Sequence, residues 1–319
     1  MVLSSFTSLG FQLFVLNRAR TNRLLAELRE VVRAEGLTLS THEEKRIAAY
    51  TTLTAITNHW FSTLRGYKPT KEEISGALYV GAFTPATDDL MDEFNLTYEE
   101  ILDGAANGKA NAVVFRYTWE KLKSLRSHNS QFDHFLSLTL QAQNASLAQQ
   151  GEDDLSIDHL KELSFNKGGY STLLYRSVLR NPISEDEQKA IYTLGSMLQL
   201  TNDIFDIYKD SKEGAHTLVT RTRNYRFVAK LFDEMELKLK SEFSALDYSD
   251  ANKSKSYRST YVVLSRAKVA LDQYLKLQGD AAQIDLNHER SKLIVDMEKM
   301  SNIFRSIAYT SRANLNPSK

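Results

Sequence analysis

Two short acidic segments contain the residues whose types and spacing could do chemistry. The first is "DDLMDEF", at 88–94, where Asp88 and Asp92 stand four positions apart and Asp89 lies between them. In a helix, residues with this spacing share one face and lie about 6 Å apart along the axis. The segment therefore predicts a row of carboxylates on one side of a helix.

The second acidic segment is "NDIFDIYKD", at 202–210. Its polar residues Asn202, Asp206 and Asp210 follow one another at four-residue intervals and predict a second row on one helix face. Ile204 and Phe205 fall on other faces, where they could anchor the helix. The two segments thus offer two sets of oxygen ligands.

Such rows need a compensating positive charge. Like charges four residues apart on a helix repel each other. Mg²⁺ prefers oxygen ligands and is typically held by a few carboxylates together with substrate phosphates and water. Two rows facing one cavity would make a magnesium site suited to phosphate chemistry, with the metal as Lewis acid and template.

The alternative is that each row is a solvated acidic face. The flanking sequences count against it, because "GALYVGAFTPAT" at 76–87 and "AIYTLGSMLQLTN" at 190–202 contain no charged residue. An exposed helix normally carries charge along such a stretch. We therefore expect both acidic segments to end buried helices at the mouth of a cavity.

The elements that must position these residues are predicted to be helices. Apolar residues recur at three- and four-residue spacings, as in "LLAELREVVRAEG" at 24–36 and "FVAKLFDEMELKLKSEFSAL" at 227–246. Alternating, strand-like runs bounded by turn pairs do not occur. The fold class is therefore predicted to be all-α.

Helix starts are marked by hydroxyl residues. Thr41, Thr70 and Ser184 each precede a helical pattern and have a glutamate within three residues, which predicts capping. No linker divides the chain, so residues 1–319 are expected to form a single domain of ten or eleven helices. Further helices are predicted at 98–107, 110–127, 129–149, 156–180, 224–246, 256–278 and 288–309.

Composition excludes several classes. The 40 basic and 40 acidic residues give a net charge of zero, which argues against a nucleic-acid partner. The absence of cysteine excludes disulfides and thiolate metal sites. No apolar run reaches membrane-spanning length. Because residues 1–20 lack a basic start and a cleavage site, they predict a helix rather than a signal peptide, and a cytoplasmic location is expected.

The two acidic segments also resemble the motifs of a known family. "DDLMDE" at 88–93 looks like the aspartate-rich first motif of class I terpene synthases and related prenyl-diphosphate enzymes. "NDIFDIYKD" resembles their second motif, Asn-Asp-x-x-Ser-x-x-Lys-Glu, with Asp206 where Ser or Thr is usual and Asp210 where Glu is usual. The following "GAHTLV", at 214–219, is similar to a segment that often follows this motif in bacterial members.

The resemblance implies an isoprenoid-synthase-type helical bundle with a central active-site cavity. It implies a lyase that ionises one linear prenyl diphosphate, cyclises it or eliminates a proton from it, and releases diphosphate. Three Mg²⁺ ions are expected, and a homodimer is common in the superfamily. The implied metal ligands are Asp88, Asp89, Asp92, Asn202, Asp206 and Asp210.

The resemblance also implies residues around the substrate, each with a plainer alternative. The candidates for binding diphosphate are Lys209, Arg176, Lys167, Arg305 and Tyr309. The basic residues among them, except Lys209, could equally be solvated surface charges. Core packing is the alternative for the aromatic pocket candidates. The candidates for the substrate pocket are Phe83, Tyr79, Gly168, Gly169, Tyr170 and Trp60.

Two features are expected to interrupt helices near that pocket. Gly168 and Gly169 inside a helical pattern predict either a mid-helix break facing the substrate or a short loop between two helices. Pro85, just before the first acidic segment, removes a helix hydrogen bond and predicts a kink.

Other functions remain open at this stage. The second segment also resembles the corresponding motif of squalene and phytoene synthases and of chain-elongating prenyl transferases. Chain-elongating enzymes have arginines soon after the first motif, and the corresponding segment, 93–104, has none. A head-to-head synthase joining two prenyl diphosphates is an alternative, although "FTPAT" at 83–87 stands where such enzymes carry an arginine just before the first motif. A non-catalytic helical scaffold with a degenerate site is the other, prompted by the replacements at Asp206 and Asp210. Substrate length and product skeleton are not predicted.

Overall fold

The structure is a computed structural model, and it describes residues 17–94, 96–126, 129–150 and 155–315. Every regular element in these residues is a helix, which confirms the all-α prediction. Most of the helix predicted for residues 1–20 lies outside the described residues. Within the described chain, no helix combines the length and apolar character needed to cross a membrane.

The helices divide into two compact units, which we describe separately. Unit 1 contains the described parts of 145–173 and 184–315, and unit 2 those of 17–144 and 174–183. Helix α8 (Ile157–Ser177) contributes to both units.

Unit 2 is built around α4, which carries the first acidic segment at its end. Helix α4 packs against α3 and α6, and α2 packs against α3 and α6 in turn. The largest buried side chains of unit 2 include Trp60, Phe61 and Phe115. The helices are α2 (Arg18–Ala34), α3 (Thr41–Arg65), α4 (Lys71–Phe94), α5 (Tyr98–Leu102), α6 (Ala110–Arg126) and α7 (Phe132–Ser146).

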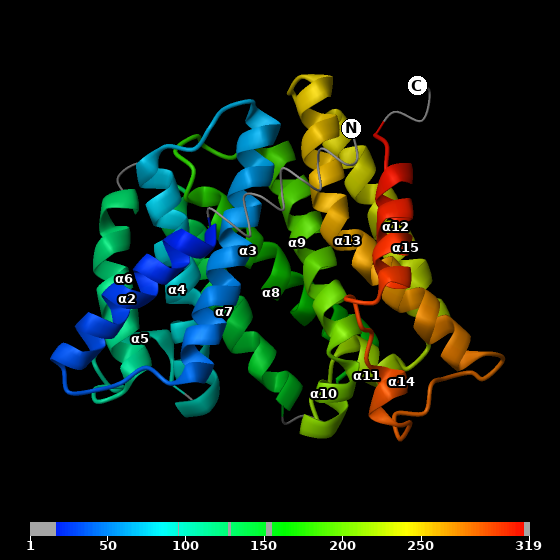
Figure 1. The fold of residues 1–319 in the computed structure, drawn as a ribbon, viewed down its shortest axis with the longest axis horizontal. Helices are drawn as coiled ribbons and strands as arrows, with labels where there is room; N and C mark the ends of the chain where they lie inside the picture. Colours follow the sequence, from blue (N-terminus) through cyan, green and yellow to red (C-terminus); the bar gives the residue numbers. More distant parts are fainter. Residues whose placement is uncertain (1–16, 95, 127–128, 151–154, 316–319) are drawn as a thin grey trace. The chain divides into compact units, whose positions relative to one another are not determined.

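Unit 1 is built around α9, which ends in the second acidic segment. Helices α9, α12 and α13 pack against one another and α15 packs on α13 (Figure 1). Phe232, Phe243 and Tyr257 fill the core between them. Besides α8, the elements are the 3₁₀ turn η2 (Leu147–Gln150), α9 (Glu185–Phe205), α10 (Ile207–Glu213), α11 (Leu218–Thr222), α12 (Tyr225–Ala245), α13 (Asp250–Gln278), α14 (Arg290–Leu293) and α15 (Met300–Arg312).

Two of the three predicted helix starts are confirmed. The amide of Glu73 donates to the Thr70 hydroxyl at the start of α4, and Ser184 caps α9 through the amide of Glu187. The prediction for Thr41 is wrong by one residue, because Ser40 is the cap of α3 and Thr41 is already helical. Ser40 and Glu43 form a reciprocal capping box, which only Ser40 can complete at this spacing.

The interruption predicted at Gly168 and Gly169 is wrong in both forms. Helix α8 runs through both glycines without a break or loop. The glycines instead allow α9 to come close: a Cβ atom on Gly168 would stand 2.3 Å from the Gly195 carbonyl oxygen, and one on Gly169 would stand 2.4 Å from the Tyr192 ring. Both positions are therefore filled by helix packing rather than by a substrate.

The single helix predicted for 288–309 is also wrong. The chain forms the short α14, an irregular segment at 294–299, and then α15. The Asp296 carboxylate accepts a hydrogen bond from the Glu298 amide at 2.9 Å, and the Asp296 carbonyl accepts one from the Asn302 side chain at 2.8 Å. An aspartate carboxylate that accepts a hydrogen bond from the backbone amide two residues later favours a turn over a helix.

A further predicted boundary is wrong. The helix predicted for 98–107 is the shorter α5, which ends at Leu102 before Gly104 adopts a positive φ of 86°. Pro85 lies inside α4 without ending it, and the kink predicted there stays a prediction.

Candidate active site

The first acidic segment lies at the end of α4 and is held by Arg46 of α3. The Arg46 guanidinium lies 3.0 Å from the Asp89 carboxylate and 3.6 Å from that of Asp88. Asp89 is buried and also accepts a hydrogen bond from the Asn111 amide at 3.0 Å. One guanidinium thus compensates two of the three predicted carboxylates within the protein itself.

Asp88 has a second partner in Tyr50, whose hydroxyl donates to it at 3.1 Å. The negative charge of Asp88, followed by burial, raises the pKa of Tyr50 well above its ordinary value. Tyr50 therefore stays protonated and acts as a donor to the carboxylate.

Asp92 differs from the other two carboxylates because it is exposed. The Gln143 side chain of α7 donates a hydrogen bond of 3.1 Å to its carboxylate. Among the three predicted ligands of the first segment, Asp92 is the one with open surface for a cation.

The second acidic segment spans a helix boundary that the sequence did not predict. Helix α9 ends at Phe205, and α10 begins after Asp206. Two backbone hydrogen bonds still continue across the boundary, from the Asp206 amide to the Asn202 carbonyl at 2.9 Å and from the Asp210 amide to the Asp206 carbonyl at 2.8 Å. The Asn202 side-chain amide donates to the Asp206 carboxylate at 3.1 Å. The i to i+4 backbone hydrogen bonding of a helix therefore continues from Asn202 to Asp210 across the boundary.

Asp203, between these residues, has a different environment. It is buried and accepts hydrogen bonds from the Ser164 hydroxyl at 2.6 Å and the Gln199 side chain at 2.8 Å. The four-residue spacing of Gln199 and Asp203 could have revealed that pair, but nothing in the sequence points to Ser164. Asp203 fixes the end of α9 against α8.

The carboxylates of this segment affect one another's protonation. Burial, followed by the charges of Asp203 and Asp206, raises the pKa of Asp210 to about 7. Burial likewise raises the pKa of Asp206. The protein itself therefore leaves negative charge here incompletely compensated, and a cation would relieve the repulsion.

The two segments fit a magnesium ion to different degrees. In the described part of the chain, no group of three or more His, Asp or Glu side chains gathers closely enough to hold a metal. The predicted set Asn202, Asp206 and Asp210 contains two carboxylates and one amide, a donor set of oxygens that suits Mg²⁺. The first segment lies in unit 2 and the second in unit 1, so their meeting at one site stays a prediction.

Two of the predicted diphosphate ligands lie near the second segment. The Lys209 side chain is 64% exposed, and its ammonium lies 3.9 Å from the Glu213 carboxylate. The positive charge of Lys167, on α8, opposes the effect of burial on the pKa of Asp203. Lys209 also opposes the effect of burial on the pKa of Asp206 and Asp210, whereas Lys167 acts on Asp203, which is not a predicted ligand.

Arg305 and Tyr309 on α15 come together at a partner that the sequence did not predict. Both donate to the same carboxylate oxygen of Asp272 on α13, the tyrosine hydroxyl at 2.7 Å. Their predicted role as diphosphate ligands stays a prediction. In this structure the pair joins α15 to α13.

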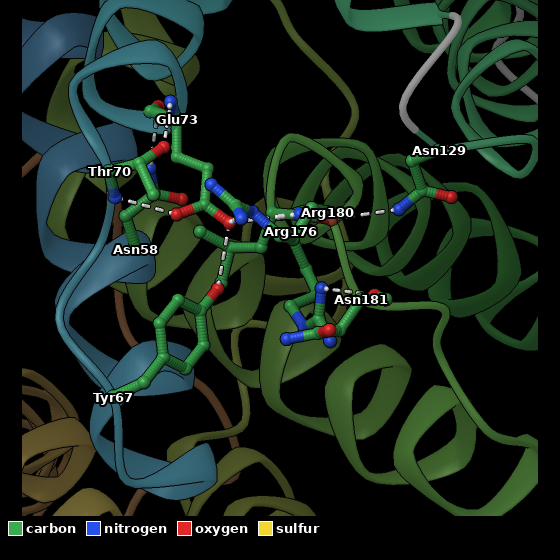
Figure 2. A network of polar contacts seen from close by, with 9 residues as sticks. Asn58, Tyr67, Thr70, Glu73, Asn129, Arg176, Arg180 and Asn181 are labelled. Carbon is green, nitrogen blue, oxygen red and sulfur yellow. Dashed lines mark hydrogen bonds and ion pairs between the residues drawn. The ribbon is translucent and has the colours of Figure 1, made fainter.

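The role of Arg176 as a diphosphate ligand stays a prediction, and its surroundings are buried and polar. Arg176 has no exposed surface, and its guanidinium donates to the Asn181 carbonyl at 3.2 Å. Figure 2 shows it among the polar side chains that surround the buried carboxylate of Glu73. Glu73 accepts hydrogen bonds from the Tyr67 hydroxyl and the Arg180 amide, both at 3.0 Å. Arg176 therefore belongs to a network that secures the chain after α8.

The predicted aromatic pocket residues separate into two groups. Trp60 has no exposed surface and packs in the core of unit 2, and its place in a pocket wall stays a prediction. Phe83 lies in an aromatic cluster, with its ring 5.2 Å from that of Phe115 and 5.9 Å from that of Trp119. A pocket of about 520 Å³ in unit 2 borders this cluster and is lined by Met91, Thr97, Tyr98, Glu99, Trp119, Asp133, Leu136, Ser137, Leu140, Gln141 and Asn144.

Tyr79 and Tyr170 have other contacts. The Tyr79 hydroxyl donates to Glu27 of α2 at 3.4 Å. The Tyr170 ring packs edge-on against that of Tyr192, at 5.4 Å between centroids, in unit 1. Of the predicted pocket residues, Phe83 alone lies in the aromatic cluster beside the unit 2 pocket.

Comparisons of the chain with protein-family models, with curated proteins and with solved structures found no match. The resemblance to class I terpene synthases therefore rests on the residues of the two acidic segments.

Proposed function

We propose that this protein is a Mg²⁺-dependent class I terpene synthase, a lyase that releases diphosphate from one linear prenyl diphosphate. The second acidic segment carries the proposal. Asn202, Asp206 and Asp210 follow one another across a helix boundary that two backbone hydrogen bonds bridge, and burial, followed by the charges of Asp203 and Asp206, raises the pKa of Asp210 to about 7. Carboxylate and amide oxygens are ligands that Mg²⁺ prefers, and a cation would relieve this repulsion.

The residues of the chain would divide the work. Asn202, Asp206 and Asp210 would hold Mg²⁺ on one side and Asp92 on the other, and the metal would neutralise the diphosphate leaving group. Asp203 would keep these ligands in place through its buried hydrogen bonds.

Lys209 would bind diphosphate oxygens directly. The apolar and aromatic side chains around Phe83 would receive the hydrocarbon chain and exclude water from it. A water-excluding pocket is needed because water would react with an allylic cation.

The test is product analysis. The protein is incubated with Mg²⁺ and each prenyl diphosphate from geranyl to geranylfarnesyl, and the organic extract is examined by gas chromatography and mass spectrometry. We expect a terpene hydrocarbon or alcohol from one of them, and no product from any would refute the proposal if the protein is folded. Adding NADPH and looking for a condensed product of two substrates tests the head-to-head alternative.

A matched pair of variants tests the site. Asp206→Asn should lower turnover by at least about 100-fold, because a charged group that supports the leaving group is lost. Asp280→Asn, at an exposed position of the same unit, is the control and should leave turnover unchanged. Equal activity of the two variants would show that Asp206 is not a ligand.

One observation favours the second candidate, a non-catalytic helical scaffold. Arg46 already compensates Asp88 and Asp89, so part of the first segment has no need of a metal. If the protein is a scaffold, Mg²⁺ and pyrophosphate together should leave the thermal unfolding midpoint unchanged. If it is the proposed enzyme, the two ligands together should raise that midpoint.

A further inference from the structure

Helix α15 packs on unit 1 through polar side chains. Its buried residues are Asn302, Ser306 and Thr310, and the helix it packs on is α13 (Figure 1). The Ser306 and Thr310 hydroxyls form hydrogen bonds with the Ser265 hydroxyl of α13, at 2.7 and 3.2 Å. A surface helix normally turns its apolar residues toward the core, so the arrangement in α15 is the reverse of the usual one.

The apolar side chains of α15 lie on another face of the helix. Met300, Ile303, Phe304 and Ile307 follow one another at three- and four-residue intervals, which places them in one row. Phe304 is 62% exposed and Met300 61%, while Ile303 and Ile307 are half-buried. Single exposed apolar residues are common on proteins, but a contiguous row of them indicates a surface that meets a partner.

Positive charges stand at both ends of this apolar row. Lys299 immediately precedes α15 and Arg312 is its last residue, and both are exposed. Neither side chain forms an ion pair within the described chain. From 299 to 319 the sequence contains four basic residues and no aspartate or glutamate. The row therefore favours a partner that is both apolar and negatively charged.

The face is too small to hold two copies of the protein together by itself. Helix α15 has 13 residues and is about 20 Å long. A stable protein–protein interface buries about 800 Å² on each partner, which is more than one row of side chains supplies. In an antiparallel pair, Lys299 of one copy would also approach Arg312 of the other. Area and charge thus both disfavour a second copy as the partner.

A lipid surface has the chemistry that the face requires. A helix at a membrane interface lies in the plane of the membrane, with its apolar side chains at the boundary between headgroups and acyl chains. Lysine and arginine side chains beside such a helix extend toward the headgroups and are attracted by anionic lipids. Because a lipid surface is continuous, it does not need a large, shape-matched patch on the protein.

We propose that α15 docks this protein on a lipid surface that contains anionic headgroups. Met300 and Phe304 enter the boundary between headgroups and acyl chains, and Lys299 and Arg312 contact the headgroups. None of these four residues is a predicted ligand of metal or diphosphate, so the proposal does not depend on terpene synthase activity.

Sedimentation with vesicles tests the apolar part of the proposal on the full chain. One set of vesicles is phosphatidylcholine alone, and the other contains phosphatidylglycerol and phosphatidylcholine in equal parts. We expect the wild type to bind the mixed vesicles more strongly, and Phe304→Ser to weaken that binding about fivefold or more. Leu237→Ser is the matched control, because Leu237 is 69% exposed on α12 of the same unit, and it should bind as the wild type does.

A second pair of variants tests the charged part. Lys299→Gln combined with Arg312→Gln should weaken binding to the mixed vesicles about tenfold or more, because each cation near an anionic membrane contributes to the attraction. Lys230→Gln, at a position 79% exposed on α12, is the control and should leave binding unchanged. Raising the salt concentration should weaken binding of the wild type in the same direction.

Circular dichroism checks that each variant is folded, and Met300→Ser replaces Phe304→Ser if that variant is not. No binding of the folded wild type to the mixed vesicles would overturn the proposal, as would equal binding by Phe304→Ser and Leu237→Ser. A wild-type dimer that Phe304→Ser dissociates, measured by light scattering without lipid, would assign the face to a second copy if vesicles are not bound. Product analysis needs no vesicles, so failure of this proposal leaves terpene synthase activity to be judged separately.

Discussion

Arg46 is the residue on which the charge balance of the first acidic segment depends. It contacts both Asp88 and Asp89, and Asp89 is nearly inaccessible, with a side chain 5% exposed. A buried carboxylate that loses its cationic partner retains the full cost of desolvation. The structure therefore gives Arg46 a role in the stability of unit 2.

Replacing this arginine should be costly. Arg46→Met keeps much of the aliphatic length but removes the charge, and we expect the free energy of unfolding to fall by about 3 kcal/mol or more. Arg29→Gln is the control, since it breaks the more exposed Arg29–Glu44 pair of the same unit and should cost at most about 1 kcal/mol. Urea unfolding followed by circular dichroism measures both. Similar losses for the two variants would contradict the role given to Arg46.

At this scale the sequence predicts the acidic residues but not their partners. Four-residue spacing singled out Asp88, Asp206 and Asp210 as candidate ligands, because residues four apart share a face of a helix, although Asp206 stands between α9 and α10. Arg46 contacts its carboxylates from another helix some forty residues earlier in the chain. Asp272 likewise meets Arg305 and Tyr309 only through the packing of α13 and α15. Contacts between helices depend on tertiary packing, which periodicity does not contain.

At the scale of elements, Gly168 sets how closely α8 and α9 approach. A Cβ atom there would meet the backbone oxygen of Gly195, which cannot rotate away. At the neighbouring Gly169, the obstacle is the Tyr192 side chain, which has torsional freedom. The same substitution at two adjacent positions therefore separates a backbone clash from a side-chain clash.

We expect Gly168→Ala to destabilise the protein by about 2 kcal/mol more than Gly169→Ala. Alanine gains about 1 kcal/mol of helix propensity over glycine at either position, so this gain cancels in the comparison. The remaining difference reflects displacement of α8 from α9 in one variant and rotation of a ring in the other. Denaturant unfolding of the two variants gives the difference directly. Equal stabilities would show that the helices separate without cost.

Helix existence is easier to predict than helix ends. The apolar spacing of 227–246 predicts α12 nearly to the residue, because burial of one face decides the helix. Ends depend on single side chains instead: Ser40 rather than Thr41 completes the capping box of α3, and Asp296 stabilises a turn before α15. The break predicted at the glycines of α8 is wrong because glycine is needed there for the close approach of Gly195, which lies on another helix.

At the scale of the whole molecule, the proposed function requires both units. The first acidic segment belongs to unit 2 and the second to unit 1. Trp60 and Trp119, the chain's 2 tryptophans, both lie in unit 2. Tryptophan fluorescence therefore follows the unfolding of unit 2, whereas circular dichroism follows the helices of both units.

This difference makes the joint use of the two segments testable. If both acidic segments hold one cluster of Mg²⁺ and pyrophosphate, adding Mg²⁺ and pyrophosphate together should raise the unfolding midpoint detected by fluorescence by a few degrees. This is the shift expected when ligand binding stabilises the folded protein by about 3 kcal/mol. Asp206→Asn, in unit 1, should abolish this shift in a signal that originates in unit 2, while Asp280→Asn should preserve it. A fluorescence shift that survives Asp206→Asn would show that unit 2 binds the ligands alone, and the proposal that both segments hold one metal site would fail.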